Sequence, residues 1–172
     1  MKVRNQKGFT LIELLIVVAI IGIIAAIAVP GLLRARMSGN ESSAIGSMRA
    51  INSAQVSYSA GAGQGNYAGT LDILSLPCGA AGTQGFISPD LNTNGVTKSG
   101  YIVTSIAHPT DSVAGPNDCN GTPTITAYYA TALPLTFGTT GSRGFATMAS
   151  GTIYFTVDGT APPADGTGSP LQ

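Results

Sequence analysis

Apolar residues are concentrated near the start of the chain. From Leu14 to Leu33 the sequence contains no charged residue and no polar side chain. These twenty residues would form a helix of roughly 30 Å at about 1.5 Å per residue, which matches the hydrocarbon core of a bilayer. The pattern predicts a membrane-spanning helical segment over residues 9–33.

A second pattern follows from Gly31 to Tyr58, where polarity rises but helical spacing continues. The residues expected on one helix face recur at steps of three or four, namely Ala44, Ile45, Met48, Ile51, Gln55 and Tyr58. Charged residues fall mostly off this stripe, which is typical of core packing and not of a cofactor site. We therefore expect one long helix over residues 9–59, amphipathic in its second half.

Beyond Tyr58 the composition shifts to Gly, Ser, Thr, Asn and Pro, and residues 60–98 are interpreted as a connecting loop. Alternating patterns then predict strands at 100–107, 124–132, 143–149 and 152–157. The tail, residues 159–172, is too poor in apolar residues to be expected to pack and is predicted to be mobile. The predicted fold class is α+β, with the long N-terminal helix packed on an antiparallel sheet of about four strands at residues 99–158.

The distribution of charged residues predicts how the helix is oriented in a membrane. The chain has eight bases and eight acids among 172 residues, and Lys2, Arg4 and Lys7 all precede the apolar run. Basic residues stay on the cytoplasmic side of a membrane helix, so the body after the helix is expected on the far side. Without these three residues, the rest of the chain carries five bases and eight acids, which argues against tight nucleic-acid binding by the isolated subunit.

The two cysteines, Cys78 and Cys119, are expected to form a disulfide if the body is exported. Two separate thiols are the alternative. In the chain-entropy description, a bridge closing a loop of this length contributes about 4 kcal/mol to stability.

The stretch Lys7-Gly8-Phe9-Thr10-Leu11-Ile12-Glu13-Leu14, followed by the apolar run and Pro30, resembles the class III signal of bacterial type IV prepilins and type II secretion pseudopilins. This resemblance implies a pilin-like fold and a leader peptide at residues 1–8. It also implies that a prepilin peptidase cleaves between Gly8 and Phe9 and methylates the new amine of Phe9.

Glu13 is the one acid in this region, and a lone carboxylate in an apolar setting is unfavourable unless it is paired. Cleavage would create a cation at Phe9, so Glu13 of one subunit is expected to pair with the Phe9 amine of a neighbour and set the assembly register. The alternative is a carboxylate that only benefits from the helix N-terminus.

Pro30 interrupts the helical hydrogen bonds. It predicts either a simple kink or a segment, from Gly22 to Pro30, that unwinds during assembly.

Other candidate chemistry is weak. Asp90 to Gly95 matches only the first half of a calcium loop, and Asp111, Asn117, Asp118 and Asn120 form a second oxygen-rich loop. We predict no metal site and no cofactor. His108, the single histidine, is expected to be an ordinary surface residue, and no enzymatic activity is predicted.

The favoured function is that of a pilin, a homo-oligomeric subunit of a helical type IV pilus filament used for adhesion, twitching motility or DNA uptake. Its expected partners are the prepilin peptidase and the pilus assembly machinery of the inner membrane. It would sit in the inner membrane before assembly and in an extracellular pilus afterwards. Alternatives are a type II secretion pseudopilin in a periplasmic pseudopilus and, outside the family, a membrane-anchored binding module.

Overall fold

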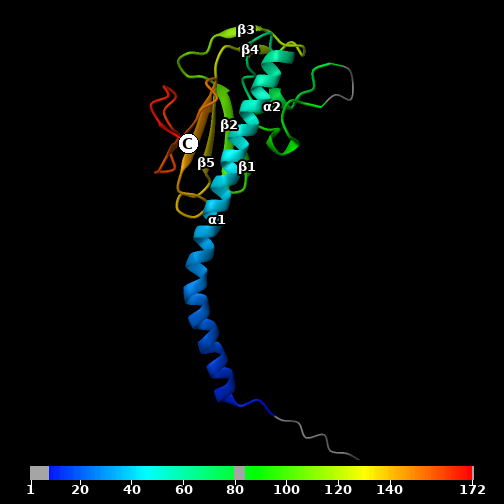
Figure 1. Ribbon diagram of the computed structural model, residues 1–172. Helices are drawn as coiled ribbons and strands as arrows, with labels where there is room; N and C mark the ends of the chain where they lie inside the picture. The colour runs from blue at the N-terminus through cyan, green and yellow to red at the C-terminus, as the bar shows by residue number, and fades with distance from the viewer. Residues whose placement is uncertain (1–7, 80–83, 172) are drawn as a thin grey trace, which may run out of the picture. The chain divides into compact units, whose positions relative to one another are not determined.

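The computed structural model describes residues 8–79 and 84–171. The chain divides into two compact units after Arg36. Helix α1 (Leu11–Gly61) contributes its first part to the first unit and residues 37–61 to the second. It is one uninterrupted helix in Figure 1. Most of the predicted leader, residues 1–7, lies outside the described residues.

In the first unit, the apolar side chains of α1 are exposed to solvent. Phe9, which precedes the helix, is 81% exposed, and no large apolar side chain from Leu11 to Leu33 is less than 48% exposed. Leucine, isoleucine and valine are normally the residues that a soluble fold buries. This segment therefore has an apolar surface that its own unit does not cover.

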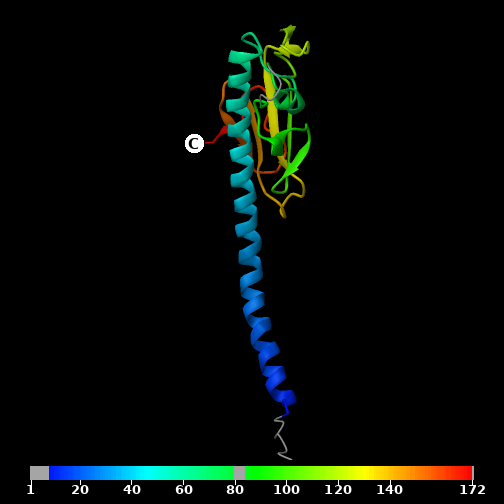
Figure 2. The same cartoon turned by 90° about the vertical axis from the view of Figure 1, so that its right-hand side faces the viewer.

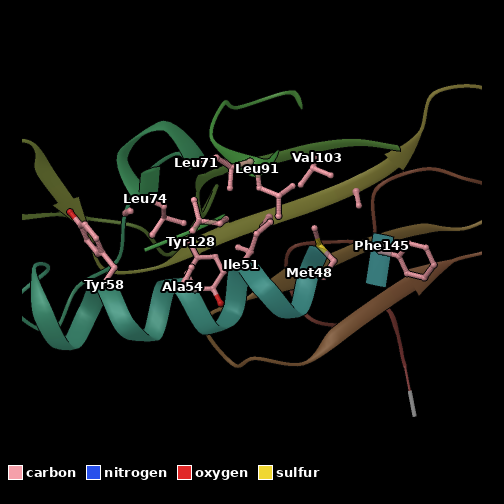
Figure 3. Packing of buried hydrophobic residues seen from close by; sticks show 14 of the residues in the cluster. Met48, Ile51, Ala54, Tyr58, Leu71, Leu74, Leu91, Val103, Tyr128 and Phe145 are labelled. Atoms are coloured by element: carbon pink, nitrogen blue, oxygen red, sulfur yellow. The ribbon is translucent and has the colours of Figure 1, made fainter. Parts of the chain in front are cut away.

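In the second unit, α1 buries one face. Met48, Ile51 and Tyr58 are almost inaccessible, and they point into the core in Figure 3. The buried positions follow the helical spacing expected from the sequence; they are Glu41, Ala44, Ser47, Met48, Ile51, Ala54, Gln55 and Tyr58. Figure 2 shows the sheet against one side of this part of the helix.

The core is completed by an antiparallel sheet with strand order β1-β2-β5-β6-β7-β8. Its strands are β1 (Val96–Lys98), β2 (Tyr101–Ala107), β5 (Tyr128–Pro134), β6 (Gly144–Met148), β7 (Ile153–Thr156) and β8 (Ser169–Pro170). A separate two-stranded sheet consists of β3 (Ala114–Asn117) and β4 (Pro123–Ile125).

The sheet is larger than the predicted four strands. The strands β2, β5, β6 and β7 correspond to the four expected segments, whereas β1, β3, β4 and β8 were missed. Those four have only two to four residues each, which is too short for alternation to be recognised. The predicted segment 124–132 also joined the end of β4 to the start of β5.

Alternation along the strands decides what the sheet presents to the helix. Tyr101 and Val103 of β2, Tyr128 of β5 and Phe145 of β6 belong to the buried cluster. The Tyr128 hydroxyl donates to Asn52 Oδ1 of α1 at 2.9 Å. These inward residues therefore lie on the helix side of the sheet.

The region expected to be a plain loop, residues 60–98, contains structure that packs. It holds α2 (Leu71–Ser75), the 3-10 helix η1 (Pro89–Leu91) and β1. Leu71, Leu74 and Leu91 are almost completely buried in the core. Isolated leucines in segments of three to five residues have no periodicity to detect, so the sequence pattern did not distinguish them from a loop.

The predicted mobile tail also packs onto the sheet through its described residues. Strand β8 pairs with β7, and Leu171 N–H donates to the carbonyl of Ile153 at 2.7 Å. The Tyr129 hydroxyl donates to the carbonyl of Pro162. The described part of the tail therefore packs, contrary to the expectation, through hydrogen bonds to its backbone carbonyls and through Leu171, which lies against the core.

His108 is buried at 6% exposure and is not a surface residue. Its Nε2 lies 2.8 Å from the carbonyl oxygen of Ala164, and its Nδ1 accepts the N–H of Asp111 at 3.2 Å. The ring also lies edge-on against Tyr129. His108 is thus a second attachment point for the C-terminal segment.

Candidate processing and assembly site

The predicted cleavage residues precede the first turn of α1. Gly8 and Phe9 are exposed, and neither belongs to the helix. A side chain added at Gly8 would meet nothing within 4 Å. The junction is therefore accessible within the described part of the chain.

Glu13 caps the start of α1. Its Oε2 accepts both the Thr10 N–H, at 2.9 Å, and the Thr10 hydroxyl, at 2.6 Å. Glu13 N–H donates in return to Thr10 Oγ1 at 3.3 Å. This reciprocal arrangement is a capping box, which satisfies backbone donors that the helix itself leaves unpaired. The Thr-x-x-Glu spacing before an apolar run was visible in the sequence, but Thr10 was not identified there.

The carboxylate is only partly used by this cap. Among the described residues, hydrogen bonds reach Oε2 and none reaches Oε1. A carboxylate oxygen accepts hydrogen bonds from more than one donor. Helix capping and pairing with a second cation are therefore compatible at Glu13.

Pro30 lies inside α1, and the helix continues on both sides of it. Proline has no N–H, so the carbonyl four residues earlier, at Ala26, loses its usual helical partner. Residues 22–30 are nevertheless helical. The predicted weak segment thus has one missing hydrogen bond and an intact helical path.

By length and composition, α1 contains a segment that could cross a membrane. In the second unit the same helix is covered by the sheet, beginning at Glu41, its first buried residue. The apolar surface available for assembly or membrane insertion is therefore the part that precedes the body.

Glu41 fixes the start of the buried part of α1, and sequence reasoning did not identify it. Its Oε1 accepts the Ser142 N–H and hydroxyl, both at 2.9 Å, and the Arg143 N–H at 3.2 Å. Its Oε2 accepts Arg143 Nε at 2.8 Å and lies 2.8 Å from Nη2. The Arg143 guanidinium also lies 5.5 Å from the centroid of Phe145.

These contacts determine the ionisation of Glu41. Burial raises the pKa of the carboxyl group, but the hydrogen bonds from Ser142 and Arg143 and the charge of Arg143 outweigh burial and lower the pKa below its ordinary value. The ionised form is therefore favoured in the folded body. The ion pair between Glu41 and Arg143, which are distant in sequence, thus joins α1 to the loop before β6.

The predicted disulfide is present. Cys78 and Cys119 are bonded, with their Cα atoms 5.8 Å apart. Next to Cys119, Asp118 Oδ2 accepts the Tyr58 hydroxyl at 2.8 Å. The bridge therefore holds the segment after α2 to the β3–β4 turn near the C-terminal end of α1.

The oxygen-rich loops have structural partners. Asp90 forms an ion pair with Lys98, and Asn94 Oδ1 accepts the Ser105 N–H at 2.7 Å. Asp118 Oδ1 accepts the N–H groups of Asn120 and Thr122. Across residues 8–79 and 84–171, no group of three His, Cys, Asp or Glu side chains is placed to hold a metal ion.

Comparison with known proteins places these features in a family. Residues 3–29 match the family model described as the prokaryotic N-terminal methylation motif. The fimbrial protein EcpC of Eikenella corrodens is 38% identical over 103 residues, covering 54% of this chain and 67% of that protein.

Two further relatives match over shorter stretches. The type IV wide pilus major component PilA4 of Thermus thermophilus is 66% identical over 38 residues, covering 22% of this chain and 29% of that protein. The type IV major pilin PilA of Myxococcus xanthus is 50% identical over 54 residues, covering 31% of this chain and 24% of that protein. The match thus spans less than a third of these two relatives. No solved structure gives a significant match.

An apolar N-terminal helix that begins at a methylation motif and continues into a helix-on-sheet body defines a pilin-like protein. The extent of the similarity to EcpC makes the assignment specific: the chain belongs to the type IV pilin family.

Proposed function

We propose that the protein is a structural subunit that polymerises through the apolar half of α1 into a type IV pilus. The observation that carries this proposal is the exposure of every large apolar side chain from Leu11 to Leu33. Such a surface is stable in lipid or against other apolar helices, and is unfavourable in water. The names of the relatives, which are pilus and fimbrial proteins, support the pilus rather than a secretion pseudopilus.

In this proposal a prepilin peptidase cleaves after Gly8 and methylates the amine of Phe9. The subunit waits in the inner membrane and is then moved by the assembly machinery into an extracellular filament of identical subunits. Adhesion, twitching motility and DNA uptake are the proposed uses of that filament.

Glu13 provides the register between subunits. Its Oε2 accepts the hydrogen bonds of Thr10 in its own chain, which in this proposal leaves Oε1 to pair with the Phe9 amine of a neighbour. A subunit displaced along the bundle would leave this carboxylate and amine unpaired in an apolar environment, at a penalty of several kcal/mol. Unwinding of Gly22 to Pro30 accommodates the helix in the filament, since Pro30 already removes one hydrogen bond there.

The test compares Glu13→Ala with Glu13→Gln. Glutamine retains an oxygen that accepts the Thr10 hydrogen bonds but removes the charge, so it separates capping from pairing. Both variants should insert in the membrane and be cleaved, yet neither should appear in sheared surface filaments. Intact-mass analysis reports the N-terminus, which should be a methylated Phe9.

Each outcome bears on a different part of the proposal. A normal yield of filaments from Glu13→Gln would exclude the charge pair, and a mature chain beginning at Met1 would exclude processing at Gly8. Filaments that remain in the periplasm would identify the secretion pseudopilus instead. Processed protein that stays monomeric in wild-type cells would favour a membrane-anchored binding module.

A further inference from the structure

One end of the sheet has an exposed apolar surface that the assembly proposal does not use. We define the end patch as Leu135, Phe137 and Val157, which are 55%, 58% and 73% exposed. Leu135 and Phe137 belong to the β5–β6 loop, and Val157 follows β7 directly. A Cβ on Gly159 would lie 2.6 Å from the Phe137 ring, so the segment after β7 packs beside this loop.

Hydrogen bonds hold the loop that carries Phe137 in a defined conformation. Gly138 N–H donates to the carbonyl of Gly141 at 2.9 Å, and Thr140 N–H donates to the carbonyl of Thr136 at 2.9 Å. Asn40 Nδ2 of α1 donates to the carbonyl of Thr140 at 2.8 Å. The adjoining Ser142 and Arg143 bind Glu41. The exposed apolar side chains thus belong to a loop that is attached to the helix.

The register between α1 and β6 tells which end of the body this is. Arg143, just before β6, is bonded to Glu41, whereas Thr147 Oγ1 donates to Asn52 Oδ1 at 2.9 Å. The start of β6 therefore lies beside the N-terminal side of the buried part of α1, and the end of β6 lies further toward the C-terminal end of the helix. The β5–β6 loop continues toward the N-terminal side, so the end patch lies where α1 enters the body.

Chain connectivity then limits how far this end is from the proposed membrane span. Leu33, the last residue of the apolar run, precedes Asn40 by seven residues. Seven residues measure about 10 Å as a helix, so Asn40 lies just beyond a headgroup layer of roughly 5–8 Å. The β5–β6 loop continues from Asn40 toward the N-terminal side of α1 and can therefore reach this layer. Arg34 and Arg36, both exposed, lie within this connection, and their positive charges attract anionic headgroups.

We propose that the end patch binds the lipid surface of the membrane in which the unassembled subunit is anchored. This inference rests on the proposed function, specifically on the membrane-spanning role of α1. Leu135, Phe137 and Val157 would lie at headgroup depth, where aromatic and aliphatic side chains of peripheral segments partition. Asp158, next to Val157, accepts hydrogen bonds from Thr160 and would remain on the aqueous side, which limits the contact to the interface.

The chain has no tryptophan, so a single introduced tryptophan reports its own environment. The full-length protein is reconstituted in phosphatidylethanolamine and phosphatidylglycerol vesicles that contain lipids brominated high on the acyl chain. Phe137→Trp is the test variant, and Leu135→Trp repeats the measurement at a neighbouring exposed position. Roughly twofold quenching is expected for both, as for an interfacial side chain.

Two matched variants complete the experiment. Val113→Trp replaces a side chain that is 67% exposed just before β3. Strands β3 and β4 lie near the C-terminal end of α1 in Figure 1. There Tyr58 of α1 donates to Asp118, and Gln64, just after the helix, donates to the carbonyl of Asn117. The Val113→Trp variant should therefore not be quenched. Ile20→Trp, in the middle of the apolar run, should be quenched most strongly by lipids brominated deep in the chain.

Failure of this inference and failure of the proposed function give different results. If only Ile20→Trp is quenched, α1 spans the membrane and the end patch does not touch it. If Ile20→Trp is not quenched, the membrane span itself is wrong. Equal quenching of Val113→Trp would also overturn the inference. If the Phe137→Trp side chain is shielded from water only at high protein-to-lipid ratio, a second copy of the chain covers the end patch. Binding of the patch to lipid is then excluded.

Discussion

The two halves of α1 differ in what covers them. From Leu14 to Leu33 the helix is apolar on all sides and exposed, whereas after Met37 it buries one stripe that includes polar residues. Gln55, for example, is fully buried, and its amide exchanges two 2.9 Å hydrogen bonds with the backbone of Ala68. Hydrophobicity alone therefore does not define the core of this protein. A buried polar group with a complete set of partners belongs to the fold, and an exposed apolar segment indicates a partner outside the chain.

Loss of the disulfide should have the largest effect on the body while leaving the first half of α1 unchanged. Replacing Cys78 and Cys119 together with serine should lower the free energy of unfolding of the body by about 4 kcal/mol. Urea denaturation in detergent, followed by near-ultraviolet circular dichroism of the tyrosines, measures this change. Membrane insertion of the first half should be unaffected, and the reduced wild type is the control. An unchanged denaturation midpoint would mean that the bridge does not stabilise the body.

The same substitution made in both halves tests the comparison directly. Ile51→Ala removes a completely buried side chain and should destabilise the body by about 3 kcal/mol, through lost burial and the cavity left behind. Ile21→Ala, at a position that is 59% exposed, should leave the denaturation midpoint of the body unchanged. Equal effects of the two substitutions would show that the first half is stabilised by the body.

Glu41 tests where coverage of the helix begins. Glu41→Gln should lower stability at neutral pH by about 2 kcal/mol, because Arg143 loses its charged partner. The folded-state pKa of Glu41 is lowered from the ordinary 4.5. Its contribution is therefore present above pH 4.5 and is lost as the pH falls through the lower folded-state pKa.

The control for this prediction is Glu13→Gln, in the first half, which should leave the acid denaturation of the body as in the wild type. Unfolding of wild type and Glu41→Gln at pH 7 and pH 3 gives the comparison, and the gap between them should narrow at the lower pH. A gap that stays constant would show that ionisation of Glu41 does not contribute.

The smallest effect concerns the tyrosines of the second half. Burial, together with the negative charge of Glu41, raises the pKa of Tyr101 to about 12, and its hydroxyl donates to the carbonyl of Arg143. The neutral ring stabilises the folded state below pH 10, and this contribution is lost as the pH rises toward 12. Tyr101→Phe should cost about 1 kcal/mol at pH 7 and weaken the decline above pH 10. An alkaline profile identical to that of the wild type would contradict this.

Sequence patterns predicted the parts of the molecule in which a repeat runs long enough to be seen. The apolar run, the stripe through Met48 and Ile51, and four of the strands have such repeats. The short elements between residues 60 and 98 do not, and neither does the C-terminal segment attached by His108 and Tyr129.

The candidate site was only partly predictable for a related reason. Gly8, Phe9 and Glu13 lie in one contiguous motif, and the Cys78–Cys119 pair follows from there being only two cysteines. By contrast, Glu41 and Arg143 are 102 residues apart, and their ion pair depends on the tertiary fold. The capping role of Thr10 has a local signal, the Thr-x-x-Glu spacing within the same motif.

The ends of the sheet have a consequence for how copies of this chain avoid the wrong kind of polymer. Strand β8, with two residues including Pro170, forms one edge, and β1, with three residues, forms the other. Short edges and proline offer few unpaired backbone groups to a strand from another molecule, which is how natural sheets resist amyloid-like stacking. Copies of the chain can associate through the apolar half of α1 or through the edges of the sheet. The short edge strands disfavour the second contact, which would give disordered aggregates. Deleting residues 169–171 would uncover β7 and should make the body precipitate through its exposed strand edge.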